Sequence, residues 1–322
     1  MKKLWNIFFL GIFFLNLCWN QDVASLTVSF WNVENLFDMV DDPEKNDNEF
    51  SIGGKKNVTQ EIYALKLVHS AEVLADLDAD ILGICEVENR FMMEELNKAF
   101  TGRNYKIIHY DSPDRRGIDC ALFYDESKFT ILESKQIKNT LSSGKPTRDI
   151  VYVKGQFGGE ILHVFVNHWP SNYGGREQAI PKRAETARFV REKVEKILNE
   201  DPKAEILLMG DFNEGPNEQN IQNLSKDILI NLMEPFIGKK GVGTYVYRGQ
   251  DSLLDQFIAS SGLLDDKGLK IEDNAVSILD LPKYRQQRGK YQHYPFRFWA
   301  GEKLLGGYSD HLAISVEINL IQ

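Results

Sequence analysis

The chain has 322 residues, of which 43% are hydrophobic and 26% charged, proportions typical of a soluble globular protein with a sizeable core. Its formal net charge of −9 argues against tight, passive binding to nucleic acid, which usually needs a basic surface. It does not exclude an enzyme that acts on nucleic acid, because turnover tolerates weak binding and a bound cation offsets repulsion locally.

The N-terminal segment has the pattern of a secretory signal peptide. Two lysines precede an apolar run from Leu4 to Leu17, which is shorter than the ~20 apolar residues of a membrane span. We predict that residues 1–21 are a signal peptide, that 22–322 form one domain, and that the protein is secreted or periplasmic. A lipid anchor on Cys18 and an uncleaved anchor helix remain alternatives.

Short strands dominate the rest of the chain, with amphipathic helices between some of them. This pattern favours sheets packed together with helices outside, a mixed α/β layered domain. In chain order, strands are predicted at 26–30, 81–87, 118–124, 150–157, 161–169, 206–212, 256–260 and 311–318, and helices carry the apolar faces 67/71/74 and 187/190/194/197.

The two cysteines beyond the signal peptide, Cys85 and Cys120, lie inside apolar strand-like runs. Buried free thiols are the default for such positions, and nothing indicates a disulfide between them. No Cys/His spacing suggests a zinc site.

Acids, amides and histidines stand at the ends of the apolar strands. Any one of them alone is equally well explained as a strand end that reaches water. Burying several ionised carboxylates in apolar strands is expensive unless they are paired or bind a metal, so together they predict a shared site at one edge of the sheets. The set is Asn32, Glu86, His168, Asp211, Asn213, Asp255, Asp310 and His311.

These residue types indicate metal-assisted hydrolysis. Carboxylate and amide oxygens suit a hard cation such as Mg²⁺, with Mn²⁺ as a substitute. Two histidines could transfer protons near neutral pH. The sequence has no Gly-x-Ser-x-Gly elbow of an acyl-transfer enzyme and no Gly-Lys-Ser/Thr phosphate loop.

At these residues the sequence resembles the endonuclease/exonuclease/phosphatase superfamily, whose members include DNase I and the exonuclease III-type repair nucleases. The resemblance runs from about residue 26 to 318. It implies a four-layer α/β sandwich, in which two central mixed β-sheets are flanked by helices, with the site at one edge of the sheets. Its segments are 31–35, 86–88, 116–119, 167–171, 210–213 (Gly-Asp-Phe-Asn), 254–257 and 309–311 (Ser-Asp-His).

The resemblance also implies roles for the matching residues. Asn32 and Glu86 would hold Mg²⁺, Glu86 directly, and Asp310 would contribute to the metal region. His311 would face the phosphate and be oriented by Asp255.

Further roles follow from the same resemblance. Asp211 and Asn213 would position the attacking water and the phosphate oxygens, and the identity of the general base is left open. His168 would serve acid/base chemistry as in the DNase I-like branch, with Asp119 as its candidate carboxylate partner.

Arg116, Asp119 and Arg148 are the candidate substrate-binding residues, although a solvated loop explains Arg116 equally well. Arg183 is predicted to serve the exposed face of a helix. His163 lies an odd number of residues from the strand-end histidine, so it should face the opposite way.

Three functions compete. We predict a monomeric, Mg²⁺-dependent phosphodiesterase that hydrolyses DNA or RNA. The alternative is a hydrolase of small or lipid phosphoesters, which is disfavoured because the chain lacks the Trp-Cys-Asp-Arg pattern of inositol-polyphosphate 5-phosphatases and the His-Thr-Gln of sphingomyelinases. A non-catalytic binding protein is the third reading, and the filled set of polar positions argues against it.

Overall fold

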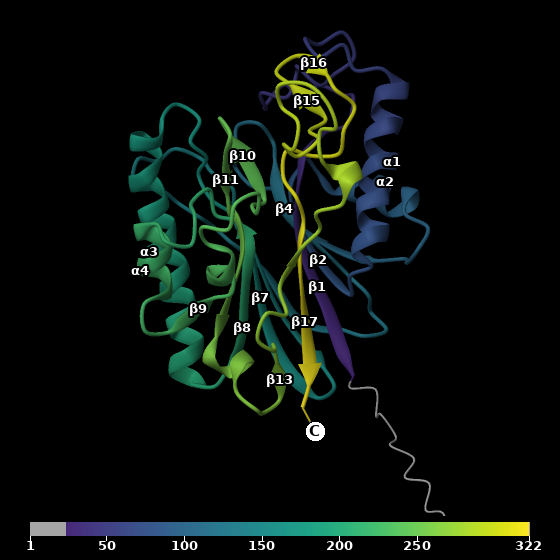
Figure 1. Cartoon of the computed structure of the whole chain (residues 1–322). Helices are drawn as coiled ribbons and strands as arrows, with labels where there is room; N and C mark the ends of the chain where they lie inside the picture. The colour runs from purple at the N-terminus through teal and green to yellow at the C-terminus, as the bar shows by residue number, and fades with distance from the viewer. Residues whose placement is uncertain (1–23, 322) are drawn as a thin grey trace, which may run out of the picture.

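The computed structural model describes residues 24–321, so the predicted signal peptide and Cys18 lie outside the described residues. Two mixed β-sheets pack face to face, and helices cover the outer face of each sheet (Figure 1). This arrangement confirms the predicted four-layer α/β sandwich. None of the helices within residues 24–321 has the length and hydrophobicity of a membrane-spanning segment.

Sheet A is formed mostly by the N-terminal half of the chain and by the last strand. Its order is β13-β17-β1-β2-β4-β3, and β14 also pairs with β17. The pair β1–β2 is parallel, and the other pairs are antiparallel. The strands are β1 (Ser25–Leu36), β2 (Ile81–Val87), β3 (Lys106–His109), β4 (Asp119–Tyr124), β13 (Leu269–Lys270), β14 (Ser277–Ile278) and β17 (Ile314–Leu320).

Sheet B has the order β5-β6-β7-β8-β12-β9. Its only parallel pair is β7–β8. The strands are β5 (Thr130–Ile137), β6 (Ile150–Phe157), β7 (Glu160–His168), β8 (Glu205–Asp211), β9 (Leu229–Asn231) and β12 (Asp255–Ser260).

Helices α1 and α2 cover sheet A, and α3 and α4 cover sheet B (Figure 1). Thr59 and Asn89 cap the first two helices with side-chain oxygens that accept backbone N–H groups. The helices are α1 (Gln60–Leu77), α2 (Arg90–Ala99), α3 (Arg176–Glu200) and α4 (Gln219–Ser225); the short elements are hairpins β10 (Tyr245–Tyr247) with β11 (Gln250–Ser252) and β15 (Trp299–Ala300) with β16 (Lys303–Leu304), and 3₁₀ turns at Glu234–Phe236, Ser261–Leu264 and Pro282–Tyr284.

The main core lies between the two sheets and is built from alternating strand residues such as Val28 and Phe30 of β1, Val166 of β7 and Met209 of β8. Two smaller cores pack the outer sheet faces against the helices. Since apolar burial contributes roughly 25 cal/mol per Å², this layered core is what holds the strand ends in fixed positions.

The register of sheet B sets the spacing of its polar strand ends. Asn167 pairs with Gly210 and His168 with Asp211 across β7–β8, while Asp255 pairs with Asp211 across β12–β8. A Cβ at position 210 would lie 2.4 Å from the carbonyl oxygen of Asn167, so only glycine fits there. Asp211 therefore sits between His168 and Asp255.

Both ends of the described chain lie at the opposite edge of the sandwich from these residues (Figure 1). The backbone N–H of Leu320, at the end of β17, donates to the carbonyl of Ala24, just before β1. The polar strand ends and the two ends of the described chain therefore occupy opposite poles of the sandwich.

Candidate active site at the sheet edge

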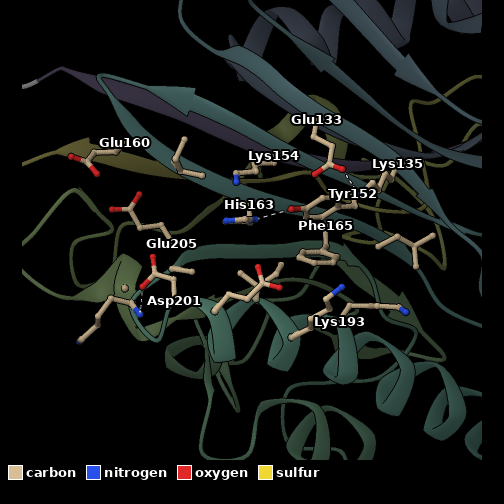
Figure 2. Close-up of a pocket in the computed structure, with 18 of the residues that line it drawn as sticks. Glu133, Lys135, Tyr152, Lys154, Glu160, His163, Phe165, Lys193, Asp201 and Glu205 are labelled. Carbon is tan, nitrogen blue, oxygen red and sulfur yellow. Dashed lines mark hydrogen bonds and ion pairs between the residues drawn. The ribbon is translucent and has the colours of Figure 1, made fainter.

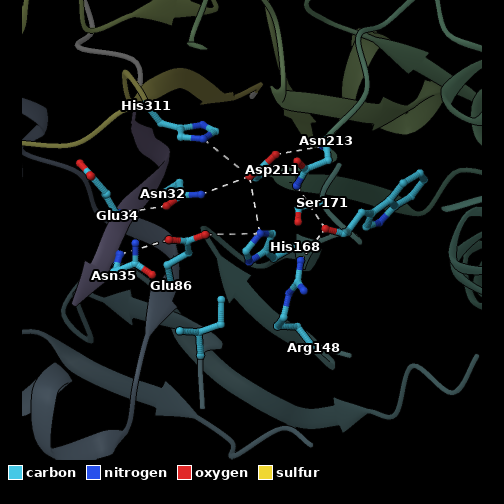
Figure 3. Close-up of polar contacts among 12 residues, drawn as sticks. Asn32, Glu34, Asn35, Glu86, Arg148, His168, Ser171, Asp211, Asn213 and His311 are labelled. Carbon is cyan, nitrogen blue, oxygen red and sulfur yellow. Dashed lines mark hydrogen bonds and ion pairs between the residues drawn. The ribbon is translucent and has the colours of Figure 1, made fainter. Parts of the chain in front are cut away.

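The two sheets bring most of the predicted side chains to one place (Figure 3). Asn32 from β1 donates its side-chain amide to Asp211 Oδ2 of β8 over 3.1 Å, which links sheet A to sheet B. His168 Nε2 lies 3.6 Å from the same Asp211 oxygen and 3.9 Å from Glu86 Oε1. One cluster thus contains residues from β1, β2, β7 and β8.

His311 and Asp255 form a buried pair. The Nδ1 atom of His311 is hydrogen-bonded to Asp255 Oδ2 at 2.7 Å, and its Nε2 atom lies 3.9 Å from Asp211 Oδ2. Ser309 holds the segment in place, because its hydroxyl donates to the carbonyl of Asn32 and accepts the backbone N–H of His311. The geometry agrees with Asp255 orienting His311.

The backbone is irregular where sheet A supplies its side chains. Register shifts interrupt β1 between Asn32 and Leu36 and β2 between Cys85 and Val87. Glu86 has a φ of 66°, a conformation that non-glycine residues adopt at a cost of order 1–3 kcal/mol and that clusters at functional sites. These bulges turn Glu86 into the cluster, and the N–H of Asn35 donates to its Oε2 atom.

Burial and neighbouring charges shift the pKa values of the two histidines of the cluster in opposite directions. Burial alone would lower the pKa of His311, but the carboxylates of Asp255 and Asp211 outweigh it and hold that pKa well above its usual range. Burial, reinforced by the charge of Arg148, holds the pKa of His168 well below its usual range. Near neutral pH, His311 is therefore an imidazolium and His168 a neutral imidazole.

Asp211 is the central carboxylate. Burial raises its pKa to about 7 against the opposing charge of His311, and the carboxylate of Asp255 adds to the rise. The backbone N–H of Asn213 donates to its Oδ1 atom, and the Asn213 side chain donates to the carbonyl of Trp169. Asp211 can therefore exchange a proton near neutral pH.

The donor set fits a hard divalent cation. Ligand atoms of Asp211 and Asp255 lie within 4.8 Å of each other and of a ring nitrogen of His311. As an imidazolium bonded to Asp255, His311 supplies a positive charge here and no ligand atom. Glu86 Oε1 faces the same space, whereas the amide oxygen of Asn32 accepts the backbone N–H of Glu34. Carboxylate and amide oxygens are the groups that Mg²⁺ and Mn²⁺ favour, whereas a thiolate is absent from this described cluster.

Asp310 lines the cleft but is already paired with Arg297. Behind it, the buried Glu34 accepts the backbone N–H groups of Phe298 and Trp299. Burial, with the charge of Asp310, raises the pKa of Glu34 to about 8. Sequence reasoning missed this support, although Glu34 lies inside the 31–35 motif.

Asp119 is not the partner of His168, and that prediction is wrong. Its Oδ2 atom lies 3.0 Å from His109 Nε2, and its Oδ1 atom accepts the backbone N–H and the hydroxyl of Ser112. The cause is the pairing of β3 with β4, which places His109 opposite Ala121, two residues from Asp119 on the same strand. His168 instead faces Asp211 and Glu86.

The two arginines predicted to bind substrate differ in position. Arg148 is buried and donates to the carbonyl of Trp169, with its Nη1 atom 3.3 Å from Asp114 Oδ2. It does not line the cleft, so its predicted contact with substrate is at odds with this position. Arg116 is half-exposed with its Nη2 atom 3.8 Å from Glu86 Oε1, close enough to the cluster to reach a substrate.

Arg183 is wholly buried, which contradicts its predicted place on an exposed helix face. Its Nε atom donates to Glu214 Oε1 over 2.8 Å, and its Nη1 atom donates to the carbonyl of Pro170 and the side chain of Asn172. This pair ties α3 to the loops that follow β7 and β8. Arg183 thereby supports the backbone on which His168 and Asp211 are carried.

A cleft of about 1290 Å³ opens over the cluster. Glu86, His168 and His311 lie at its floor, and its walls come from the loop after β7, the loop after β8 and the β10–β11 hairpin. Its volume exceeds the roughly 300–1,000 Å³ of a typical small-molecule pocket, and convergent polar groups in a cleft are typical of a catalytic site.

A second hollow, of about 990 Å³, lies between the outer face of sheet B and α3 (Figure 2). His163 lies in it and is hydrogen-bonded to Tyr152, so it faces away from the cleft as predicted. Burial lowers its pKa to about 4. No cluster of potential metal ligands among residues 24–321 lies in this hollow, and it lacks the chemistry of the cleft.

Glu205, which lines the second hollow, leads to a prediction about how stability depends on pH. Glu205 has a buried Oε2 atom without a hydrogen-bond partner, and burial raises its pKa to about 7. In the unfolded chain the carboxyl ionises near 4.5, so stability should fall as pH rises from there to about 7. Glu205→Gln should therefore raise the free energy of unfolding by on the order of 2 kcal/mol at pH 8 and by less at pH 5.

Urea unfolding at the two pH values tests this expectation. The exposed Glu302, which does not line the hollow, supplies the control Glu302→Gln, for which little change is expected at either pH. An equal effect of Glu205→Gln at pH 5 and pH 8 would contradict the linkage argument.

Several solved structures have the same fold. Zebrafish (D. rerio) TDP2, complexed with a single-strand DNA product, is 16% identical with a TM-score of 0.59, and the match covers 92% of this chain and 99% of that chain. The human Nocturnin catalytic domain is 18% identical with a TM-score of 0.59, and the match covers 92% of this chain and 94% of that chain. A mannosyl-6-phosphatase from Bacteroides thetaiotaomicron is 20% identical with a TM-score of 0.59, and the match covers 91% of this chain and 99% of that chain.

At these identities the structural likeness establishes the fold alone. A search of curated proteins found no match. The sequence pattern that defines the Endonuclease/Exonuclease/phosphatase family matches residues 27–320, which is nearly all of the described chain. The chain therefore belongs to the endonuclease/exonuclease/phosphatase family.

Proposed function

We propose that this protein is a secreted or periplasmic, Mg²⁺-dependent phosphodiesterase, and that nucleic acid is its substrate. The family consists of phosphoric ester hydrolases that use divalent metal ions. The single observation that carries the proposal is the buried His311–Asp255 pair facing Asp211, with Glu86 and Asn32 beside it. The nucleic acid complex of TDP2 supports the substrate class.

Glu86 would bind the metal ion directly, with Asn32 beside it, and Mn²⁺ would substitute for Mg²⁺. When bound, such an ion neutralises phosphate charge and stabilises the leaving oxygen. Asn32 also donates its amide to Asp211, so it fixes the orientation of that carboxylate.

The chain's own residues would share the remaining work. Asp211 would take the proton from the attacking water, since its pKa of about 7 suits a base at neutral pH. The imidazolium of His311, held by Asp255, would donate to a phosphate oxygen and stabilise the charge that develops there. Asn213 would help to position the same phosphate.

Hydrolysis of bis-p-nitrophenyl phosphate tests the reaction class. We expect turnover with Mg²⁺ or Mn²⁺ and its loss in EDTA. A plasmid-nicking gel under the same conditions tests the nucleic acid substrate. Absence of hydrolysis of both substrates by folded protein would refute the proposal.

The two histidines of β7 provide a matched test of the site. His168→Asn should lower kcat roughly 10- to 100-fold, because the neutral imidazole next to Asp211 and Glu86 is lost. His163→Asn, on the opposite face of the same strand, should leave kcat unchanged. Equal effects of the two substitutions on kcat would place the reaction elsewhere.

A hydrolase of small phosphoesters remains the second candidate. The observation that favours it is the charge of the cleft, whose wall carries two cationic side chains, Arg176 and Lys239, against the carboxylates of Glu86, Glu218 and Asp310 and that of Asp251. Cleavage of simple esters without plasmid nicking would support this candidate.

Removal of residues 1–21 and a monomeric state also remain proposals. Mass spectrometry of the protein recovered from outside the cytoplasm should find an N-terminus near Asp22. A mass that includes the first 21 residues would support the anchor-helix alternative, and an added lipid on Cys18 would support the lipid anchor.

A further inference from the structure

We infer that the cleft accepts phosphodiesters flanked by unpaired bases, as in single-stranded nucleic acid. Tyr173 and Tyr247 are the specificity-determining residues, and their rings stack on those bases. This inference rests on the proposed function. It adds the form of the substrate and the residues that select it.

The charge of the cleft is the first argument. A duplex is held mainly through its phosphates, and each phosphate contact needs a cationic or other donor group. Apart from the imidazolium of His311, the cleft is lined by Arg176, which is already paired with Glu218, and by Lys239, which is unpaired among the described lining residues. Arg116, beside the cluster, has its Nη2 atom 3.8 Å from Glu86 Oε1. The cleft therefore has little with which to hold a polyphosphate backbone.

The aromatic side chains of the cleft are the second argument. Tyr173, in the loop after β7, is 95% exposed, and Tyr247, on the β10–β11 hairpin, is 56% exposed. Such rings contribute little to the core, and both line the cleft that contains His311. The guanidinium of Arg248 lies over one face of the Tyr247 ring, 5.2 Å from its centroid, so a base would stack on the other face. A base that is free of a partner strand can stack on a tyrosine ring, and this contact is indifferent to base identity.

The attachment of the hairpin is the third argument. Tyr245 forms a β-bridge with His311, and their rings lie 4.9 Å apart between centroids. The N–H of Asp255 donates to the hydroxyl of Thr244. Because side chains alternate along a strand, Tyr247 projects from the same face as Tyr245, two residues further from the reacting groups. A ring next to the scissile phosphate would lie within reach of Tyr247.

These features predict a defined substrate preference. Stacking needs unpaired bases, so a duplex, whose bases are stacked on one another, would lose the aromatic contacts and gain no cationic ones. Affinity for a single strand should depend weakly on salt, because few counterions are released when so few phosphates are neutralised.

The experiment compares three end-labelled 12-mer substrates in Mg²⁺: single-stranded oligothymidine, the same length of abasic tetrahydrofuran units, and a duplex. We expect kcat/KM to be highest for the oligothymidine. Tyr173→Ala and Tyr247→Ala should each raise KM for it roughly 5- to 100-fold with kcat nearly unchanged, and the Phe variants should behave like the wild type.

Tyr291→Ala is the matched control, because Tyr291 is 53% exposed but does not line the cleft. Equal kcat/KM for oligothymidine, the abasic chain and the duplex, or unchanged KM in both alanine variants, would overturn the inference alone. Failure to hydrolyse any substrate, including bis-p-nitrophenyl phosphate, would overturn the proposed function as well.

Discussion

Replacing His311 with Asn should lower kcat for a phosphodiester by roughly 100- to 10,000-fold, the range for loss of a proton-transferring or charge-stabilising side chain. The Asn amide can still donate to Asp255, so the buried carboxylate keeps a partner. What is lost is the Nε2 atom, which lies 3.9 Å from Asp211 Oδ2 on the cleft side. The loss should therefore fall on kcat more than on folding.

Steady-state kinetics with bis-p-nitrophenyl phosphate and urea unfolding should be measured on the same preparation. We expect the free energy of unfolding of His311→Asn to stay within about 1 kcal/mol of the wild type. Asp255→Asn is the companion variant, and it should also lower kcat because it removes the charge that keeps His311 protonated. A kcat within threefold of the wild type for His311→Asn would remove that residue from the reaction.

Arg183→Leu should lower the free energy of unfolding by about 3–5 kcal/mol, the cost of leaving a buried charge without its partner. The remaining carboxylate of Glu214 would keep only the side-chain amide of Asn220 as a donor. The carbonyl of Pro170 would lose its donor as well. Because these groups hold the loops behind His168 and Asp211, kcat should also fall under conditions in which the variant is still folded.

Chemical denaturation of two further variants separates charge from packing. The double variant Arg183→Leu/Glu214→Leu removes both buried charges and should recover much of the lost stability. Arg188→Leu, an exposed arginine on the same helix, should change stability by less than about 0.5 kcal/mol. If Arg183→Leu and Arg188→Leu lower the free energy of unfolding equally, the buried Arg183–Glu214 ion pair contributes no more to stability than an exposed arginine does.

The strands that carry the site could be predicted because each is an apolar run that ends in a polar residue. β2 and β6 have the predicted bounds, and β7 and β8 differ by one residue at each end. Their burial on both faces, between the central core and a helical layer, produces continuous apolar sequences that stand out from the loops. The polar residue that interrupts such a run is then conspicuous.

Pairings between distant segments could not be predicted in the same way. The partner of Asp119 depends on β3, a strand of four residues with too little alternation to be recognised. The burial of Arg183 depends on Glu214, a residue 31 positions away that the sequence does not relate to it. The bulge that turns Glu86 inward is a local backbone departure and leaves no periodic signal.

The start of β1 and the end of β17 lie next to each other and provide an attachment point away from the cleft. A surface linker, a fluorescent reporter or a bead attached at Ala24 or after Leu320 would be anchored at the pole remote from His311. Long substrates could then approach the immobilised catalyst without meeting its support. Joining residues 24 and 320 by a short peptide and opening the chain at a distant loop should yield a circularly permuted protein.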